Sequence, residues 1–140
     1  MLKITSEALQ GMLAHAQADY PNEACGYLAA RDGLVVRAIP MRNVDASPTS
    51  YTMDPLEQLK VQKGLREARL EHAGIYHSHV ATAAYPSKRD IANALAIQDF
   101  CRVPYWLVTL KDQRPRARAF TLLDGHVQEE EILEVAACPH

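Results

Sequence analysis

A chain of 140 residues is long enough to bury a hydrophobic core and short enough to form one domain. Apolar residues make up 48% of it and charged residues 23%, which is typical of a water-soluble globular protein. The formal net charge of −2 lacks the basic excess of nucleic-acid-binding proteins, and 6% aromatic residues are too few for base-stacking surfaces. We therefore expect a single domain over residues 1–136, a tail at 137–140, and no nucleic-acid partner.

Two further features bear on the compartment. No apolar run approaches the roughly 20 residues of a membrane helix, and the stretch Met1-Leu2-Lys3-Ile4 lacks the pattern of a signal peptide. The three cysteines are odd in number and widely spaced, unlike a disulfide framework: Cys25, Cys101 and Cys138. These patterns predict a cytoplasmic protein without a membrane partner.

Four elements are expected in the first half of the chain, in the order helix, strand, strand, helix. Apolar residues recur at helical spacing after Thr5, and an Asp-Gly turn at 32–33 separates two strands of a hairpin. Asp54-Pro55 is typical of a helix start. The expected bounds are about 6–20, 22–30, 34–41 and 55–71, with a polar loop at 43–52.

The second half is expected to hold more strands than helices. A strand over 74–79 is followed by a loop of small residues and a helix over 87–97. Three more strands are expected at 105–110, 116–123 and 125–135, of which the first reads as buried on both faces and the last as an exposed edge rich in glutamate. This order predicts an α+β or mixed α/β fold with helices packed on a sheet.

A histidine pair stands at the end of the strand expected over 74–79. His77 and His79 are two residues apart, so both side chains of a strand point to one face there and can reach one ion. Asp90, at the start of the next expected helix, can supply a third ligand. Two histidines, one carboxylate and an open fourth position are typical of catalytic zinc sites.

Each of these residues also has a structural interpretation. A His-x-His pair is common by chance in strands, and Ser87 three residues before Asp90 resembles a capping box at a helix start.

Cys25 is expected to be a small buried side chain, because no neighbouring lysine or arginine lowers the pKa of its thiol. His72 and His126 are expected at the surface, and His15 at the surface or its rim.

Taken together, the residues from His77 to Asp90 resemble the JAMM, or MPN-plus, metalloprotease signature, which reads His-x-His, seven residues, Ser, two residues, Asp. That signature also has a glutamate upstream, at the start of a strand after the first helix. Glu23, in Pro21-Asn22-Glu23-Ala24-Cys25-Gly26, matches this position and its context. The resemblance implies a cytidine-deaminase-like α+β fold, with a mixed central sheet and helices packed on it.

The same resemblance implies a role for each site residue. His77, His79 and Asp90 would bind one Zn²⁺, with a catalytic water as the fourth ligand. Glu23 would be the general base that takes a proton from this water and later delivers one to the leaving amine. Ser87 would help to hold the developing oxyanion.

The branch of the family that the chain resembles is the minimal prokaryotic one. It lacks room for the long insertions that recognise ubiquitin in eukaryotic members, and Val80 replaces the proline that many members have after the second histidine, which leaves the loop path less fixed. The stretch from His77 to Ser87 is most similar to enzymes that release cysteine, or another small adduct, from a ubiquitin-like sulfur-carrier protein ending in Gly-Gly. The implied substrate is such a carrier, and a homodimer is compatible with the sequence.

Other interpretations stay open at this stage. A non-catalytic MPN scaffold fits the fold, although such domains lose ligands and all five positions are present here. A RadC-type DNA-repair protein has a similar metal motif, but the near-neutral charge and the lack of an added helical domain count against it. A zinc deaminase needs His-x-Glu and Cys-x-x-Cys, which the chain lacks. A peptidase acting on cell-wall or phage-tail peptides is compatible with the motif.

Overall fold

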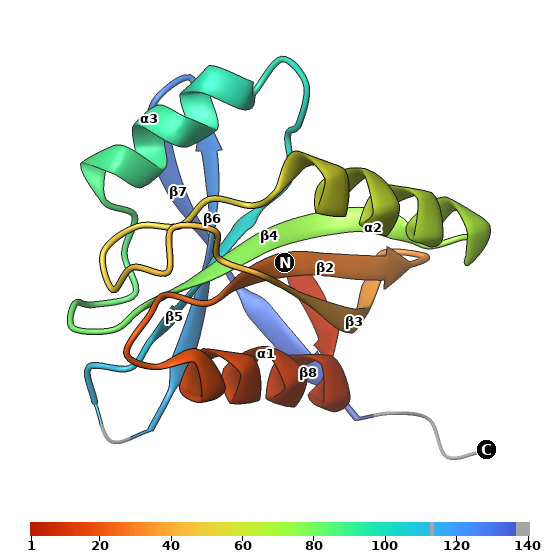
Figure 1. The fold of residues 1–140 in the computed structure, drawn as a ribbon. Helices are drawn as coiled ribbons and strands as arrows, with labels where there is room; N and C mark the ends of the chain where they lie inside the picture. The colour runs from red at the N-terminus through yellow and green to blue at the C-terminus, as the bar shows by residue number, and fades with distance from the viewer. Residues whose placement is uncertain (113, 137–140) are drawn as a thin grey trace.

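A mixed β-sheet with helices on both faces forms the fold, which we describe from a computed structural model (Figure 1). The structure describes residues 1–112 and 114–136, so the predicted tail with Cys138-Pro139-His140 lies outside the described residues. The elements are β1 (Leu2–Thr5), α1 (Ser6–Asp19), β2 (Cys25–Arg31), β3 (Leu34–Met41), α2 (Pro55–Glu67), β4 (Glu71–His79), α3 (Lys88–Ile97), β5 (Tyr105–Thr109), β6 (Arg116–Leu123), β7 (His126–Glu130) and β8 (Ile132–Val135).

The strands of the sheet lie in the order β7-β6-β5-β4-β2-β3-β1-β8. β4 pairs in parallel with β5, and β1 pairs in parallel with β3 and β8, whereas the other neighbours are antiparallel. The predicted mixed sheet is therefore confirmed. β4, which ends at His79, lies inside the sheet between β2 and β5, so its end is held from both sides.

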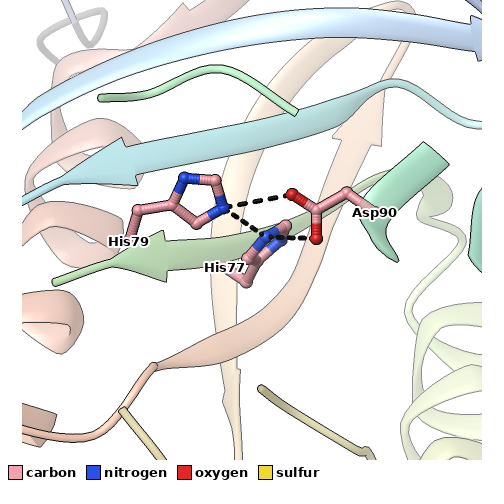
Figure 2. Close-up of side chains that lie close together, drawn as sticks. All are labelled: His77, His79 and Asp90. Atoms are coloured by element: carbon pink, nitrogen blue, oxygen red, sulfur yellow. Dashed lines mark hydrogen bonds and ion pairs between the residues drawn. The ribbon is translucent and has the colours of Figure 1, made fainter. Parts of the chain in front are cut away.

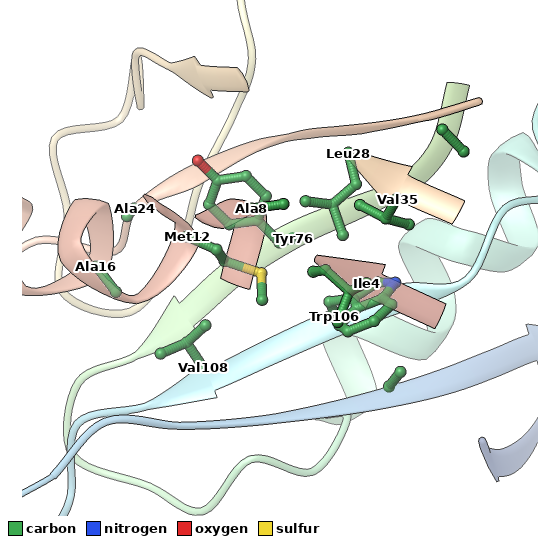
Figure 3. Close-up of a cluster of buried hydrophobic side chains, with 12 residues drawn as sticks. Ile4, Ala8, Met12, Ala16, Ala24, Leu28, Val35, Tyr76, Trp106 and Val108 are labelled. Carbon is green, nitrogen blue, oxygen red and sulfur yellow. The ribbon is translucent and has the colours of Figure 1, made fainter. Parts of the chain in front are cut away.

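Helix α1 packs on one face of the sheet. Thr5 is its N-cap, and its Oγ1 accepts a hydrogen bond from the Ala8 N–H at 3.1 Å. Its buried side chains meet the large side chains of β2, β4 and β5, which Figure 3 shows as one cluster that includes Met12, Leu28, Tyr76 and Trp106. Fully burying a side chain such as Leu28 contributes about 1.5–3 kcal/mol, so this core fixes β4 from the face opposite its histidines.

Helices α2 and α3 cover the other face (Figure 1). Their contribution to the core is small, because Leu65 is the buried residue of α2 and Ala94 that of α3. Side chains alternate along a strand, so that Tyr76 faces α1 and His77 faces α3. The histidine pair therefore opens toward the start of α3.

The prediction of a single strand over residues 125–135 was wrong, because the structure has two strands there. They are separated at Glu131, whose carbonyl accepts a hydrogen bond from the Leu2 N–H at 2.7 Å. β7 pairs with β6 and forms the predicted glutamate-rich edge, whereas β8 pairs with β1 at the opposite edge of the sheet. After the change of edge, Ile132 packs against the hydrophobic core.

Helix α2 is also shorter than predicted. It ends at Glu67 rather than near Glu71, and Arg69 then has a positive φ of 58°, outside the helical region. Because β4 begins at Glu71, His72 lies in the sheet, half-buried, with its ring stacked on Tyr27 at 4.0 Å between centroids. The surface position expected for His72 was therefore wrong.

The cysteines of the described part of the chain are free: Cys25 is buried and Cys101 is partly buried. The Cys25 side chain is fully buried in the core, as predicted, and burial raises the pKa of its thiol to about 12. Within the described ranges, no helix combines the length and the apolar character needed to cross a bilayer.

Candidate metal centre

Three side chains converge at the C-terminal end of β4 (Figure 2). His77 and His79 point to the same face of the strand, and Asp90 faces both rings from the first turn of α3. Asp90 Oδ1 lies 3.2 Å from His77 Nε2, and Asp90 Oδ2 lies 3.1 Å from His79 Nε2. The two Nε2 atoms are 3.2 Å apart. The structure thus brings together the three residues that the sequence singled out as ligands.

Asp90 is oriented by the helix that carries it. Ser87 is the N-cap of α3, and its Oγ accepts a hydrogen bond from the Asp90 N–H at 3.0 Å. In return, Asp90 Oδ2 accepts one from the Ser87 N–H at 2.9 Å. The capping-box interpretation of these two residues is therefore confirmed. Because the box fixes the Asp90 side chain, its carboxylate is directed at β4 before any ion binds.

His79 is oriented by a carbonyl group behind it. Its Nδ1 donates to the Ala83 carbonyl at 2.9 Å, which turns the ring so that Nε2 faces Asp90. The loop that supplies this carbonyl is itself tied to β5, because Thr109 Oγ1 donates to the Thr82 carbonyl at 2.6 Å. Two hydrogen bonds thus fix the loop that follows Val80, where the usual proline is missing.

The charges of the three residues are set by burial and by their mutual contacts. Burial lowers the pKa of His77 and so favours its neutral ring. Burial opposes ionisation of Asp90 as well, but hydrogen bonds from His77 and His79 outweigh it and hold the pKa of Asp90 far below its ordinary value. For His79 burial acts to lower the pKa, whereas Asp90 and the Ala83 carbonyl raise it above its ordinary value. The Asp90 carboxylate is therefore ionised and offers a negative charge to a cation.

Glu23 lies just before β2, with 6% of its surface exposed. Cys25 stands opposite His77 in the last pair of the β2–β4 ladder. The Ser78 N–H donates to the Ala24 carbonyl at 3.0 Å, so the segment of Glu23 stays beside the end of β4. Burial raises the pKa of Glu23 to about 7, and the charge of His79 acts in the opposite direction. A carboxyl that titrates near neutrality beside this set has the property that a general base needs.

Two polar residues that the sequence analysis passed over hold the Glu23 segment. Ser78 Oγ accepts a hydrogen bond from the Ala24 N–H at 2.8 Å, and Asn43 Nδ2 donates to the Glu23 carbonyl at 3.0 Å. Both side chains are buried. The place of Ser78 between two ligand candidates was a usable signal, whereas nothing in the sequence distinguishes Asn43 from the other polar residues of its loop.

The geometry of the set fits a divalent metal ion. The candidate ligand atoms lie within 4.8 Å of one another. The two Nε2 atoms are 3.2 Å apart, close to the edge, about 3.3 Å, of a tetrahedron with metal–ligand bonds of about 2.0–2.1 Å, and each lies 3.1 or 3.2 Å from one oxygen of Asp90. Two imidazoles and one carboxylate would supply three ligands to such an ion and leave a fourth position for a reacting molecule.

The mixed sheet that carries this site belongs to the JAB/MPN class of domain. The chain belongs to the family described as prokaryotic homologs of the JAB domain, whose model matches residues 5–123. This range includes every predicted site residue from Glu23 to Asp90. The family predicted from the sequence is thereby confirmed.

Characterised relatives cover most of the chain. It is 42% identical over 135 residues to a CysO-cysteine peptidase of Mycobacterium tuberculosis. The match covers 94% of this chain and 90% of that relative. It is 38% identical over 126 residues to a Thermus thermophilus protein named "Probable TtuB-protein conjugate cleaving protease", across 89% of this chain and 78% of that one.

Two solved structures match the fold. A protein of Desulfitobacterium hafniense, solved in solution, is 38% identical with a TM-score of 0.86, across 98% of this chain and 94% of that one. A JAB1/MPN domain protein from Archaeoglobus fulgidus is 17% identical with a TM-score of 0.62, across 96% of this chain and 97% of that one. These matches confirm the predicted α+β fold.

Proposed function

We propose that this chain is a zinc-dependent peptidase. It hydrolyses the amide bond after the C-terminal Gly-Gly of a small ubiquitin-like sulfur-carrier protein and releases cysteine or another amine. The observation that carries the proposal is the convergence of His77, His79 and Asp90, with the buried Glu23 close enough for its charge to act on His79. The names of the relatives in Mycobacterium tuberculosis and Thermus thermophilus support the substrate class.

His77, His79 and Asp90 would hold the ion, and their nitrogen and oxygen atoms suit Zn²⁺. Zinc held there would lower the pKa of a water molecule to about 7 and polarise the scissile carbonyl. The residues around the three ligands then supply the remaining chemistry, which consists of proton transfer, stabilisation of the oxyanion and binding of the carrier tail.

Glu23 would transfer the proton. Its carboxylate accepts the proton that water loses as the water oxygen adds to the carbonyl carbon. The protonated Glu23 then gives this proton to the amide nitrogen as the carbon–nitrogen bond breaks, so that a carboxylate and a free amine leave. A pKa of about 7 lets one carboxyl serve both steps near neutral pH.

Ser87 would stabilise the oxyanion of the tetrahedral intermediate. The capping box uses its Oγ as an acceptor and fixes the position of the oxygen. A hydroxyl has one hydrogen to donate, and the Asp90 N–H contact leaves that hydrogen available. The cap and the oxyanion contact are therefore compatible roles of one side chain, each worth a separate test.

The carrier tail would lie in a cleft of about 360 Å³ between the segment around Tyr51 and α3. Tyr51 lines this cleft and stacks on His77, so the cleft adjoins the candidate ligands. Asn93 also lines it, as does Tyr105, whose buried hydroxyl has no hydrogen-bond partner among the described residues. An extended Gly-Gly tail has no side chains, and such polar groups can bind its backbone.

The free thiols of Cys25 and Cys101 favour a reducing compartment, and we propose the cytoplasm. The proposed partner is the ubiquitin-like carrier. The alternative function is that of a scaffold, a domain that binds zinc but hydrolyses no amide bond.

The test uses purified protein and a carrier conjugate with cysteine joined after Gly-Gly, with the products identified by mass spectrometry. A second conjugate, with the carrier on a protein lysine, separates release of a free amino acid from cleavage of an isopeptide. Metal content is measured in the wild type, in His77→Ala and in the control His126→Ala, which replaces an exposed histidine.

We expect about one zinc per chain and chelator-sensitive hydrolysis in the wild type and in His126→Ala, and neither in His77→Ala. Zinc binding without hydrolysis of either conjugate would contradict the proposed substrate class and would favour the alternative function as a scaffold. Failure of the wild type to bind zinc would contradict the whole proposal.

A further inference from the structure

The two histidine rings at the end of β4 are held in place by different means. His79 is held by a hydrogen bond, because its Nδ1 donates to the Ala83 carbonyl at 2.9 Å. His77 has no such bond: its Nδ1 is buried and has no partner among the described residues. Histidines that bind metal ordinarily donate their second nitrogen to a carbonyl or carboxylate, which fixes the plane of the ring. Another contact must therefore fix the plane of His77.

That contact is made by Tyr51. The two rings are stacked, with centroids 4.5 Å apart and planes inclined by 28°. The His77 side chain is 1% exposed, and its other close ring, that of His79, approaches edge-on at 60°. Tyr51 is thus the aromatic side chain that lies against the flat face of the His77 imidazole, where it opposes rotation of the ring about the bond to Cβ.

The position of Tyr51 is built into the fold. Asn43 contacts the backbone on both sides of it: its Nδ2 donates to the Ser50 carbonyl at 2.9 Å, and its Oδ1 accepts from the Thr52 N–H at 3.2 Å. The same Nδ2 donates to the Glu23 carbonyl at 3.0 Å. One buried amide therefore joins the Tyr51 segment to the Glu23 segment, so that the loop cannot carry Tyr51 away without breaking contacts at the site.

We propose that Tyr51 is a positioning residue for the metal centre, whose stacked ring holds His77 Nε2 toward Asp90 in place of the missing hydrogen bond at Nδ1. This inference rests on the proposed function only in assuming that the three residues bind a metal. It assigns Tyr51 no contact with the ion. The stack uses the phenyl ring and not the hydroxyl, so phenylalanine should replace Tyr51 and an aliphatic side chain should not.

The experiment measures metal affinity and ligand geometry without any peptide substrate. Wild type, Tyr51→Phe and Tyr51→Leu are stripped of metal, and the affinity for Zn²⁺ is measured by competition with a chromophoric chelator. Each is also loaded with Co²⁺, whose visible absorption reports the symmetry of the ligand set. Thermal unfolding of the metal-free proteins shows whether each variant folds, and Tyr51→Met replaces the leucine variant if that one does not.

The chain offers a matched control. Tyr27 is stacked on His72, with centroids 4.0 Å apart and planes inclined by 30°, on the same sheet but away from the candidate ligands. Tyr27→Leu removes an equivalent tyrosine–histidine stack. A loss of packing alone would lower the unfolding temperature of both leucine variants without changing metal binding in either.

We expect Tyr51→Leu to bind Zn²⁺ about tenfold more weakly, at the lower end of the effects seen when residues behind metal ligands are replaced, and to show an altered cobalt spectrum. Tyr51→Phe and Tyr27→Leu should match the wild type in both measurements. Zinc affinity within twofold of wild type together with an unchanged cobalt spectrum in Tyr51→Leu would overturn the assignment. A wild type that binds neither ion would instead contradict the proposed function.

Discussion

Glu23 and His79 lie close enough for their charges to interact, just beyond the last residue pair of the β2–β4 ladder. The register that pairs Cys25 with His77 brings them together, although they are far apart in the sequence. Their charges act on each other: His79 acts to lower the pKa of Glu23, and Glu23 acts to raise that of His79. A shift of the register by one residue would turn Glu23 to the other face of the sheet.

The raised pKa of Glu23 predicts a pH-dependent stability of the metal-free protein. Burial raises the pKa from 4.5 to about 7, so the folded state binds more protons than the unfolded state between these values. Stability should therefore fall as the pH rises from 4.5 to 7, by about 3 kcal/mol from this group alone. Chemical unfolding of the wild type and of Glu23→Gln at pH 4.5 and pH 8 isolates the contribution of Glu23 to the free energy of unfolding. The glutamine variant should gain stability relative to wild type at pH 8, and an equal difference at both pH values would contradict the prediction.

Replacement of Ser87 can separate its two proposed roles. Asparagine is as good an N-cap as serine but has no hydroxyl, so Ser87→Asn should keep the stability of α3 within a few tenths of a kcal/mol. Its rate of conjugate hydrolysis should fall about 100-fold, because the oxyanion loses a donor. Ser87→Ala should lose the cap as well, at about 1 kcal/mol. Unchanged hydrolysis in Ser87→Asn would leave Ser87 as a helix cap alone.

Ser78 is predicted to stabilise the start of β2. Its Oγ is the acceptor for the buried Ala24 N–H, so Ser78→Ala leaves that N–H unpaired and should cost about 1–3 kcal/mol of unfolding free energy. Ser50→Ala is the control, because the Ser50 hydroxyl makes an exposed contact with Asp45. Denaturant unfolding measures both, and equal losses in the two variants would show that the Ser78 hydrogen bond has no special weight.

Two glycines are predicted to respond in opposite ways to replacement by alanine. A Cβ on Gly26 would collide with the Ile39 carbonyl and with the ring of Tyr76, the residue before His77. Gly26→Ala should therefore destabilise the fold by about 1–3 kcal/mol and weaken metal binding. A Cβ on Gly64, in α2, meets nothing within 4 Å, and Gly64→Ala should stabilise by about 0.5–1 kcal/mol. Thermal unfolding decides both, and a neutral Gly26→Ala would contradict the close approach of Tyr76.

The predictable part of the site is the part that depends on local spacing. The positions of His77 and His79 follow from the period of a strand, and those of Ser87 and Asp90 from a capping box. Glu23 is different, because only the resemblance to a known family connected it with the histidines. Its actual position depends on the β2–β4 register, which no spacing within the chain reveals.

Contacts between distant segments account for what the sequence did not predict. Asn43 and Tyr51 lie in a polar loop without periodic pattern, and their importance comes from Glu23 and His77, which the fold brings to them. The crossing from β7 to β8 depends likewise on pairing with β1, at the other end of the chain. His72 was misplaced because the end of α2 could not be located in a run of good helix formers.

The most direct test of the account is the rate at which Glu23→Gln, folded and loaded with zinc, releases cysteine from a carrier conjugate. The substitution keeps the size of the side chain and removes its ability to accept a proton. The account predicts unchanged zinc content and a rate about 10²–10⁴-fold below that of the wild type. A zinc-loaded Glu23→Gln protein that cleaves the conjugate as fast as the wild type would contradict it.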